Sequence, residues 1–221
     1  TDKIYDFTWI DDFAAARNYA FTQAGKEYLM WLDADDVLDE ENRQLFAELK
    51  DTLDPQVDVV MMRYHTSFDA EDQPLFTYYR ERLLKNNKGF YFVGAIHETI
   101  APRGNILHAE IAVCHRKVKP GDPDRNLRIF EKQLAEGKQL AAREQFYYGR
   151  ELYYHARYQE AVDIFQGFLA DPGGWMENKL DACRQMAYCS YKLGRDEAGM
   201  DGLSLSLRYD LPRAESCCDI R

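Results

Sequence analysis

Short apolar runs alternate with helix-like stretches in the first part of the chain. Residues 28–32 form a continuous apolar run whose length suits a strand buried on both faces of a sheet. A second buried strand is predicted at 57–62, and loose polar–apolar alternation predicts a shorter strand at 3–9. Helical spacing of apolar residues predicts helices at 13–24 and 39–53. Because these elements alternate with short connections, we expect an α/β fold with a mostly parallel sheet covered by helices.

Both predicted helices carry signals at their ends. Asp12 and Asp39 stand where a side-chain oxygen can cap free backbone N–H groups. Gly25 is placed to end the first helix, and Asp54-Pro55 to end the second. The helices are therefore predicted from capping chemistry as well as from periodicity.

Residues 76–115 have a different pattern, in which Asn, Gly and Pro separate short extended pieces. These pieces are expected at 76–84, 89–93 and 110–114. Such a pattern is typical of the mixed part of a larger α/β domain.

Long helical patterns replace the strand-like runs in the last hundred residues, and they contain an internal repeat. The segment 149–161 aligns with 186–198 at a constant offset of 37 residues. Small residues at Gly149 and Ala161, with Phe165 four positions further on, match the tight packing positions of a tetratricopeptide (TPR) helical hairpin.

These patterns predict three regions. A partial α/β domain is expected over residues 1–120, a linking helix over 121–142, and an all-α region of TPR-like helical hairpins over 143–221. The residues from Pro212 to Glu215 would begin a third repeat unit.

Composition and charge narrow the function classes. Acidic side chains outnumber basic ones by 38 to 28, so the formal charge is −10 and a nucleic acid is not expected as a partner. No apolar run reaches the roughly 18 to 20 residues that cross a bilayer, and the first residues lack the layout of a signal peptide. Five cysteines form no regular framework, as expected where thiols stay reduced. We therefore expect a cytoplasmic protein without a transmembrane segment.

Three acids, Asp33, Asp35 and Asp36, follow the apolar run 28–32. In open α/β folds, ligands bind beyond the carboxyl ends of strands. Residues two apart in an extended segment point the same way, so Asp33 and Asp35 are expected to converge on one divalent cation and the diphosphate it bridges. The alternative is a solvated loop that leads to the helix cap at Asp39.

The surrounding sequence favours the metal site. The stretch 12–20 contains Ala-Arg-Asn, and the stretch 27–36 ends in Asp-Ala-Asp-Asp. Together they resemble family 2 glycosyltransferases of the GT-A fold, in which a helix bearing Ala-Arg-Asn precedes a strand that ends in Asp-Ala-Asp-Asp. The resemblance implies sugar transfer from a nucleotide sugar, UDP-linked, to an unknown acceptor, with Mg²⁺ or Mn²⁺ as the cofactor.

The resemblance also implies roles for four residues. Asp33 would lie near the ribose and diphosphate, and Asp35 would ligate the metal, with Asp33 as a further ligand. Arg17 and Asn18 would line the donor pocket. Without the family context, Arg17 is an ordinary exposed arginine of a helix.

A second segment, from Gly94 to Glu98, resembles the Gly-x-x-His-Glu stretch that follows the metal motif in many relatives of this type. Glu98 is the candidate general base, which would deprotonate an acceptor hydroxyl in an inverting transfer. His97 would orient the acceptor or the diphosphate, unless the pair is purely structural. His115 is a candidate third metal ligand, because some GT-A enzymes complete the metal shell with a late histidine.

Two further arginines can also be interpreted either as site residues or as ordinary surface residues. Arg80 and Arg82 lie in the extended piece 76–84 and would either contact the diphosphate or lie on a solvated face.

The strands that hold the nucleoside in a complete family 2 domain are not found in the chain. Residues 3–7 match the family's third strand, so on the order of 50 to 60 residues are expected to precede them. We accordingly expect this chain to be a fragment that is inactive alone.

Two other functions compete with this interpretation. The helical repeats are expected to recruit an acceptor or protein partner or to build a homodimer. If the α/β part is degenerate, the protein is instead a TPR-type interaction scaffold. Nucleotidyltransferases also place paired acids after a strand, but the Ala-Arg-Asn helix argues against that chemistry.

Overall fold

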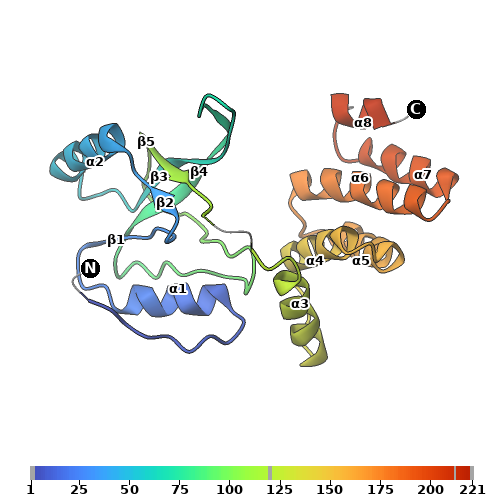
Figure 1. Ribbon diagram of the computed structural model, residues 1–221, viewed down its shortest axis with the longest axis horizontal. Helices are drawn as coiled ribbons and strands as arrows, with labels where there is room; N and C mark the ends of the chain where they lie inside the picture. The colour runs from blue at the N-terminus through green and yellow to red at the C-terminus, as the bar shows by residue number, and fades with distance from the viewer. Residues whose placement is uncertain (1–2, 119–120, 212, 220–221) are drawn as a thin grey trace. The chain divides into compact units, whose positions relative to one another are not determined.

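The computed structural model describes residues 3–118, 121–211 and 213–219 and divides the chain into two compact units (Figure 1). The first unit is Thr1–Asp122 and the second is Pro123–Arg221. Within the described ranges, no helix is both long and apolar enough to span a membrane.

The first unit is built on a five-stranded mixed sheet with the strand order β1-β4-β3-β5-β2. Its elements in chain order are α1 (Phe13–Thr22), β1 (Tyr28–Met30), β2 (Asp36–Val37), α2 (Glu40–Thr52), β3 (Val59–Phe68), β4 (Pro74–Lys85) and β5 (Ile106–His115). β3 and β5 are parallel, whereas β1–β4, β4–β3 and β5–β2 are antiparallel.

The expectation of a mostly parallel sheet is therefore wrong. A tight turn joins β3 to β4 and reverses the chain: Asp69 N donates to Gln73 O at 2.9 Å. Parallel strands need a long connection, and β4 together with the segment 86–105 supplies it between β3 and β5.

Both helices of this unit begin at the capping residues that the sequence indicates. Asp12 Oδ1 accepts from Ala15 N at 2.8 Å, and Asp39 Oδ1 accepts from Asn42 N at the same distance. α1 ends at Thr22, three positions before the Gly25 that was expected to end it.

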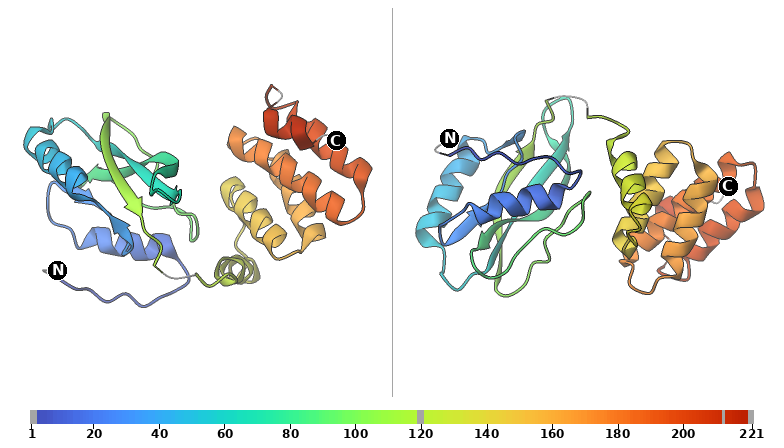
Figure 2. Two further views of the ribbon diagram at one scale, coloured as in Figure 1. Left: turned by 45° about the horizontal axis from the view of Figure 1, so that its top comes forward. Right: turned by 90° about the horizontal axis from the view of Figure 1, so that it is seen from below.

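The sheet is covered on both faces. Alternate residues of β3 point to opposite sides and therefore contribute to two different cores. Val59 contributes to a core that holds Ala14 of α1 together with Trp31 and Phe92. Its neighbour Val60 contributes to a second core, which side chains of α2 help to form. α1 and the segment 86–105 thus cover one face, and α2 covers the other (Figure 2).

Three expected strands differ from the structure. Residues 3–9 form no strand, since no backbone ladder pairs with them in the described chain. Of the run 28–32, only residues 28–30 form a strand, the short edge strand β1. Leu29 in this strand is buried, whereas Leu32 beyond its end is 43% exposed. The piece 89–93 is irregular apart from one isolated bridge between Val93 and Thr99.

The second unit is all helical in its described elements. They are α3 (Arg125–Ala135), α4 (Ala142–Tyr154), α5 (Tyr158–Ala170), α6 (Met176–Lys192), α7 (Asp196–Ser206) and α8 (Ala214–Asp219). The 37-residue offset relates the pair α4–α5 to the pair α6–α7. Pro212, the expected first residue of a third repeat, lies outside the described residues.

Small residues bring the paired helices together. A Cβ added to Gly149 would lie 2.6 Å from the Phe165 ring, and one added to Gly202 would lie 3.3 Å from Ala187 Cβ. Gly149 and Phe165 are thus in contact, as their spacing indicates. The assignment of the hairpins to the TPR class stays a prediction.

Candidate functional site

The acids that follow β1 lie in a turn rather than in an extended segment. Asp36 N donates to Asp33 O at 3.0 Å, which closes the turn over residues 33–36. Asp36 then pairs with His115 across the antiparallel β2–β5 ladder, and Arg116 N donates to Asp35 O at 2.8 Å. The expectation that the Asp33 and Asp35 side chains point the same way assumed an extended segment, and the turn removes that basis.

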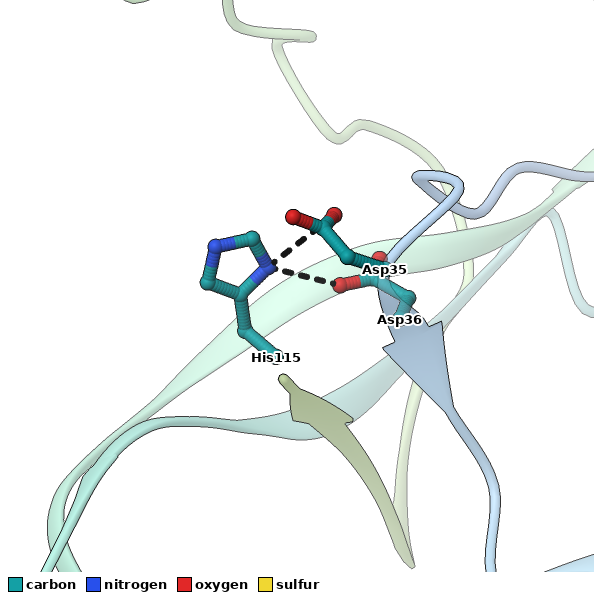
Figure 3. Close-up of side chains that lie close together, drawn as sticks. All are labelled: Asp35, Asp36 and His115. Atoms are coloured by element: carbon teal, nitrogen blue, oxygen red, sulfur yellow. Dashed lines mark hydrogen bonds and ion pairs between the residues drawn. The ribbon is translucent and has the colours of Figure 1, made fainter. Parts of the chain in front are cut away.

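Asp35, Asp36 and His115 form a cluster in which one ligand atom of each lies within 4.8 Å of the others (Figure 3). His115 Nδ1 is 3.3 Å from Asp36 Oδ1 and 3.5 Å from Asp35 Oδ1. The Asp35 and His115 side chains are partly exposed, whereas that of Asp36 is fully buried. The exposed side of the cluster therefore belongs to Asp35 and His115.

Asp36 is held by polar groups on both carboxylate oxygens. Oδ1 accepts from Tyr64 Oη at 2.9 Å, and Oδ2 accepts from Arg82 Nη1 at 2.9 Å and from Asp33 N at 3.0 Å. Burial alone raises the pKa of Asp36, but the Asp33 N–H, Arg82, Tyr64 and His115 outweigh it, so the pKa lies below its usual value. Asp36 is thus an ionised group that fixes its neighbours.

Arg82 is fully buried behind the acids, which excludes the solvated face proposed for it. Its guanidinium lies between the rings of Trp31 and Tyr64, 4.0 and 4.2 Å from their centroids. The signal for its position was the period of two in β4, because Leu84 faces the same core as Trp31. Arg80 also lies against Trp31, at 4.9 Å, and is partly exposed.

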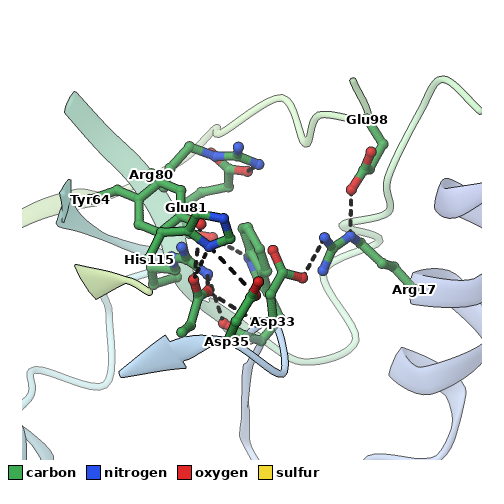
Figure 4. A network of polar contacts seen from close by, with 11 residues as sticks. Arg17, Asp33, Asp35, Tyr64, Arg80, Glu81, Glu98 and His115 are labelled. Carbon is green, nitrogen blue, oxygen red and sulfur yellow. Dashed lines mark hydrogen bonds and ion pairs between the residues drawn. The ribbon is translucent and has the colours of Figure 1, made fainter. Parts of the chain in front are cut away.

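Arg17 joins two of the predicted site residues from different parts of the chain. Its Nη2 donates to Asp33 Oδ1 at 2.6 Å and its Nε to Glu98 Oε1 at 2.5 Å (Figure 4). Burial lowers the pKa of Arg17, but the carboxylates of Glu98 and Asp33 outweigh it and the pKa is raised. The Asp33 side chain thus engages Arg17, and its backbone connects Arg17 to the cluster around Asp36.

The loop that carries Glu98 is attached to the start of α1. Phe13 N donates to Ala95 O at 2.9 Å, and Val93 and Thr99 pair through two backbone hydrogen bonds. Gly94 has a φ of +97°, a conformation that side chains disfavour. His97 precedes Glu98 with a φ of +52°, in the left-handed region.

Asn18 holds the same loop through the backbone of Phe92. Asn18 Nδ2 donates to Phe92 O at 2.9 Å, and Asn18 Oδ1 accepts from Phe92 N at 2.8 Å. The amide therefore acts structurally here, and its role in the donor pocket stays a prediction.

The donor set of the cluster fits the divalent cation that the sequence implies. A carboxylate and an imidazole are both ligands that Mn²⁺ accepts, and carboxylate oxygens also bind Mg²⁺. Because Tyr64, Arg82 and the backbone already use the oxygens of Asp36, the residues that would hold the ion are Asp35 and His115.

A hollow on the first unit does not coincide with the predicted site residues. A hollow of about 530 Å³ opens between α2 and β1, where Tyr28, Phe46 and Leu83 line it. None of the predicted site residues contributes to its walls. The predicted site residues therefore lie outside this hollow.

Comparison with known proteins bears on the first unit. No curated protein matches the chain. The model of the family described as "Glycosyl transferase family 2" matches residues 3–107, a range that includes Arg17, the three acids and Glu98 and ends before His115. Residues 3–107 are therefore similar to family 2 glycosyltransferases.

Proposed function

We propose that this protein is a divalent-metal-dependent, inverting glycosyltransferase that uses a UDP-linked sugar. The observation that carries the proposal is a continuous polar network from Glu98 to His115 (Figure 4). It joins a candidate base to a candidate metal site through Arg17, Asp33 and Asp36. An interaction scaffold would need the apolar strands for its fold, but it would not need a polar network that joins a candidate base to a candidate metal site.

The metal side of the network would receive the donor diphosphate. Asp35 and His115 would hold Mg²⁺ or Mn²⁺, which when bound neutralises the charge on the leaving diphosphate. Asp36, held by Tyr64 and Arg82, fixes the imidazole of His115. Asp33 and Arg17 would face the ribose and the phosphates.

Glu98 would act on the acceptor side. Its carboxylate takes the proton from an acceptor hydroxyl while that oxygen attacks the anomeric carbon. The bond from this carbon to the diphosphate breaks on the opposite face, and the diphosphate keeps the electron pair. Arg17 orients the Glu98 carboxylate for this role through its Nε.

The first experiment tests the metal site by electron paramagnetic resonance of Mn²⁺ titrated into the chain. Asp35→Asn should weaken Mn²⁺ binding at least about tenfold, because it removes a charged ligand. Asp51→Asn, which changes the charge equally at an exposed position of α2, is the control. Equal binding by the wild type and both variants would contradict the metal assignment.

The second experiment tests the base in the longer protein to which this chain is expected to belong, because the chain alone is expected to be inactive. It uses a panel of UDP-sugars with Mn²⁺ and measures the UDP released in the presence of acceptors. Glu98→Gln should lower kcat by about 10²- to 10⁴-fold while Mn²⁺ binding stays unchanged. Undiminished turnover by this variant would remove Glu98 from the mechanism and leave the metal site to be judged by the first experiment.

A further inference from the structure

Two arginine–tyrosine pairs in the helical unit have the same local geometry. On α4, Arg150 Nη2 donates to the Tyr154 hydroxyl at 2.8 Å. On α6, Arg184 Nη2 donates to the Tyr188 hydroxyl at 3.1 Å. In both pairs the residues are four positions apart and lie on one face of a helix.

The pair on α6 binds a carboxylate from another element of the same chain. Arg184 Nε donates to Asp219 Oδ2 at 3.1 Å, and the Tyr188 hydroxyl donates to the same oxygen at 2.5 Å. Asp219 is the last residue of α8. The arrangement shows what an arginine–tyrosine pair of this geometry recognises, namely one carboxylate oxygen held by Nε and a phenol.

The pair on α4 has the same donors without the carboxylate. Arg150 Nε is buried and has no hydrogen-bond partner among the described residues. Gln185 Nε2 donates to Asp181 Oδ2 at 2.8 Å, so this nearby acid of α6 is engaged elsewhere. Burial lowers the pKa of Arg150, but the Tyr154 hydroxyl and the charge of Asp181 outweigh it, and the guanidinium stays charged.

A charged guanidinium in this position favours an anion. The rings of Phe146, Tyr147 and Tyr154 lie around it, with centroids 5.6 to 5.7 Å from the Arg150 Cζ, and Tyr154 also accepts a hydrogen bond from Arg150 Nη2. An unpartnered buried donor costs free energy that a charge-assisted hydrogen bond would recover. Tyr154 is 60% exposed, so the tyrosine side of the pair is open to solvent.

We propose that Arg150 and Tyr154 bind a carboxylate side chain of an acidic protein segment, as Arg184 and Tyr188 bind Asp219. The site is independent of the metal cluster, because all of its residues belong to the helical unit. The proposed partner of the helical unit is therefore an acidic protein segment.

The test follows the arginine Nε–H signals of the isotope-labelled chain by NMR during titration with a hexaglutamate peptide blocked at both ends. The Arg150 signal should shift saturably toward that of Arg184, which is the internal reference for the carboxylate-bound state. Blocked hexaglutamine should leave it in place. Arg150→Gln should weaken hexaglutamate binding at least about tenfold, the effect of losing a charge-assisted hydrogen bond.

Arg208→Gln, at an exposed position of the same unit, is the control for the change of charge and should bind the peptide like the wild type. If Arg150→Gln fails to fold, Arg150→Lys keeps the charge but lacks Nε and should also lose the affinity. Equal binding of hexaglutamine, or wild-type affinity in the folded Arg150 variant, would overturn the proposal. An equal shift with inorganic phosphate at the same concentration would also overturn it, since the site would then be a general anion site.

Discussion

Asp36 and His115 face each other across the β2–β5 ladder, with His115 Nδ1 3.3 Å from Asp36 Oδ1. Asp36 also accepts hydrogen bonds from the side chains of Tyr64 on β3 and Arg82 on β4. The orientation of a partly exposed imidazole therefore depends on a carboxylate that solvent does not reach. A disturbance of the buried groups should propagate to the candidate metal site.

Asp36→Asn should destabilise the first unit strongly. The substitution leaves the guanidinium of Arg82 charged, fully buried and without its carboxylate. Breaking a buried ion pair on one side costs about 3–5 kcal/mol, so the unfolding free energy in urea should fall by that amount. Asp51→Asn is the control and should change it by less than about 0.5 kcal/mol. A loss as small as in the control would show that Arg82 does not depend on Asp36.

The pH dependence of stability gives a separate test of Asp36. Its pKa is lower in the folded protein than the value of about 3.9 for an unfolded chain. Its contribution is therefore present above about pH 4 and is lost as pH falls through the folded pKa. Unfolding free energies between about pH 5 and pH 3 should decline less steeply in Asp36→Asn than in the wild type. Identical slopes would contradict the assigned cause.

Arg17→Met should loosen the loop that carries Glu98. The change leaves the carboxylates of Asp33 and Glu98 without the cation that joins them. Hydrogen bonds to charged groups contribute about 1.5–3 kcal/mol, and a loss in this range is expected in urea unfolding. Amide hydrogen exchange at residues 93–99 should become faster. Arg43→Met, which breaks an exposed pair with Glu40, should leave both measurements near wild type.

Two glycine substitutions should change stability in opposite directions. Gly149→Ala places a Cβ 2.6 Å from the Phe165 ring and should lower the unfolding free energy by about 1–3 kcal/mol. Gly167→Ala meets nothing nearer than 4.0 Å and should raise it by about 0.5–1 kcal/mol, because alanine favours the helix. Thermal unfolding of both variants checks the pair. A neutral Gly149→Ala would show that α4 and α5 can move apart at no cost.

Much of the local structure could be predicted from the sequence. Asp12 and Asp39 cap helices because the interaction spans three residues and needs nothing beyond the helix itself. The contact between Gly149 and Phe165 follows from a repeat read along the chain. Arg17, the acids and Glu98 also stand in motifs that sequence alone relates to the family matched over residues 3–107.

The sequence by itself thus determined the helices, their caps, the repeat and the list of candidate groups. Only the tertiary structure decided which groups meet. Asp33 bonds to Arg17 while Asp35 lies beside His115, because a turn replaces the extended segment and β5 pairs with β2. The mixed sheet, the burial of Arg82 and the carboxylate contact of Arg184 have the same origin. Each depends on strands or helices distant in the chain, whose pairing is set by burial and backbone hydrogen bonding over the whole unit rather than by neighbouring residues.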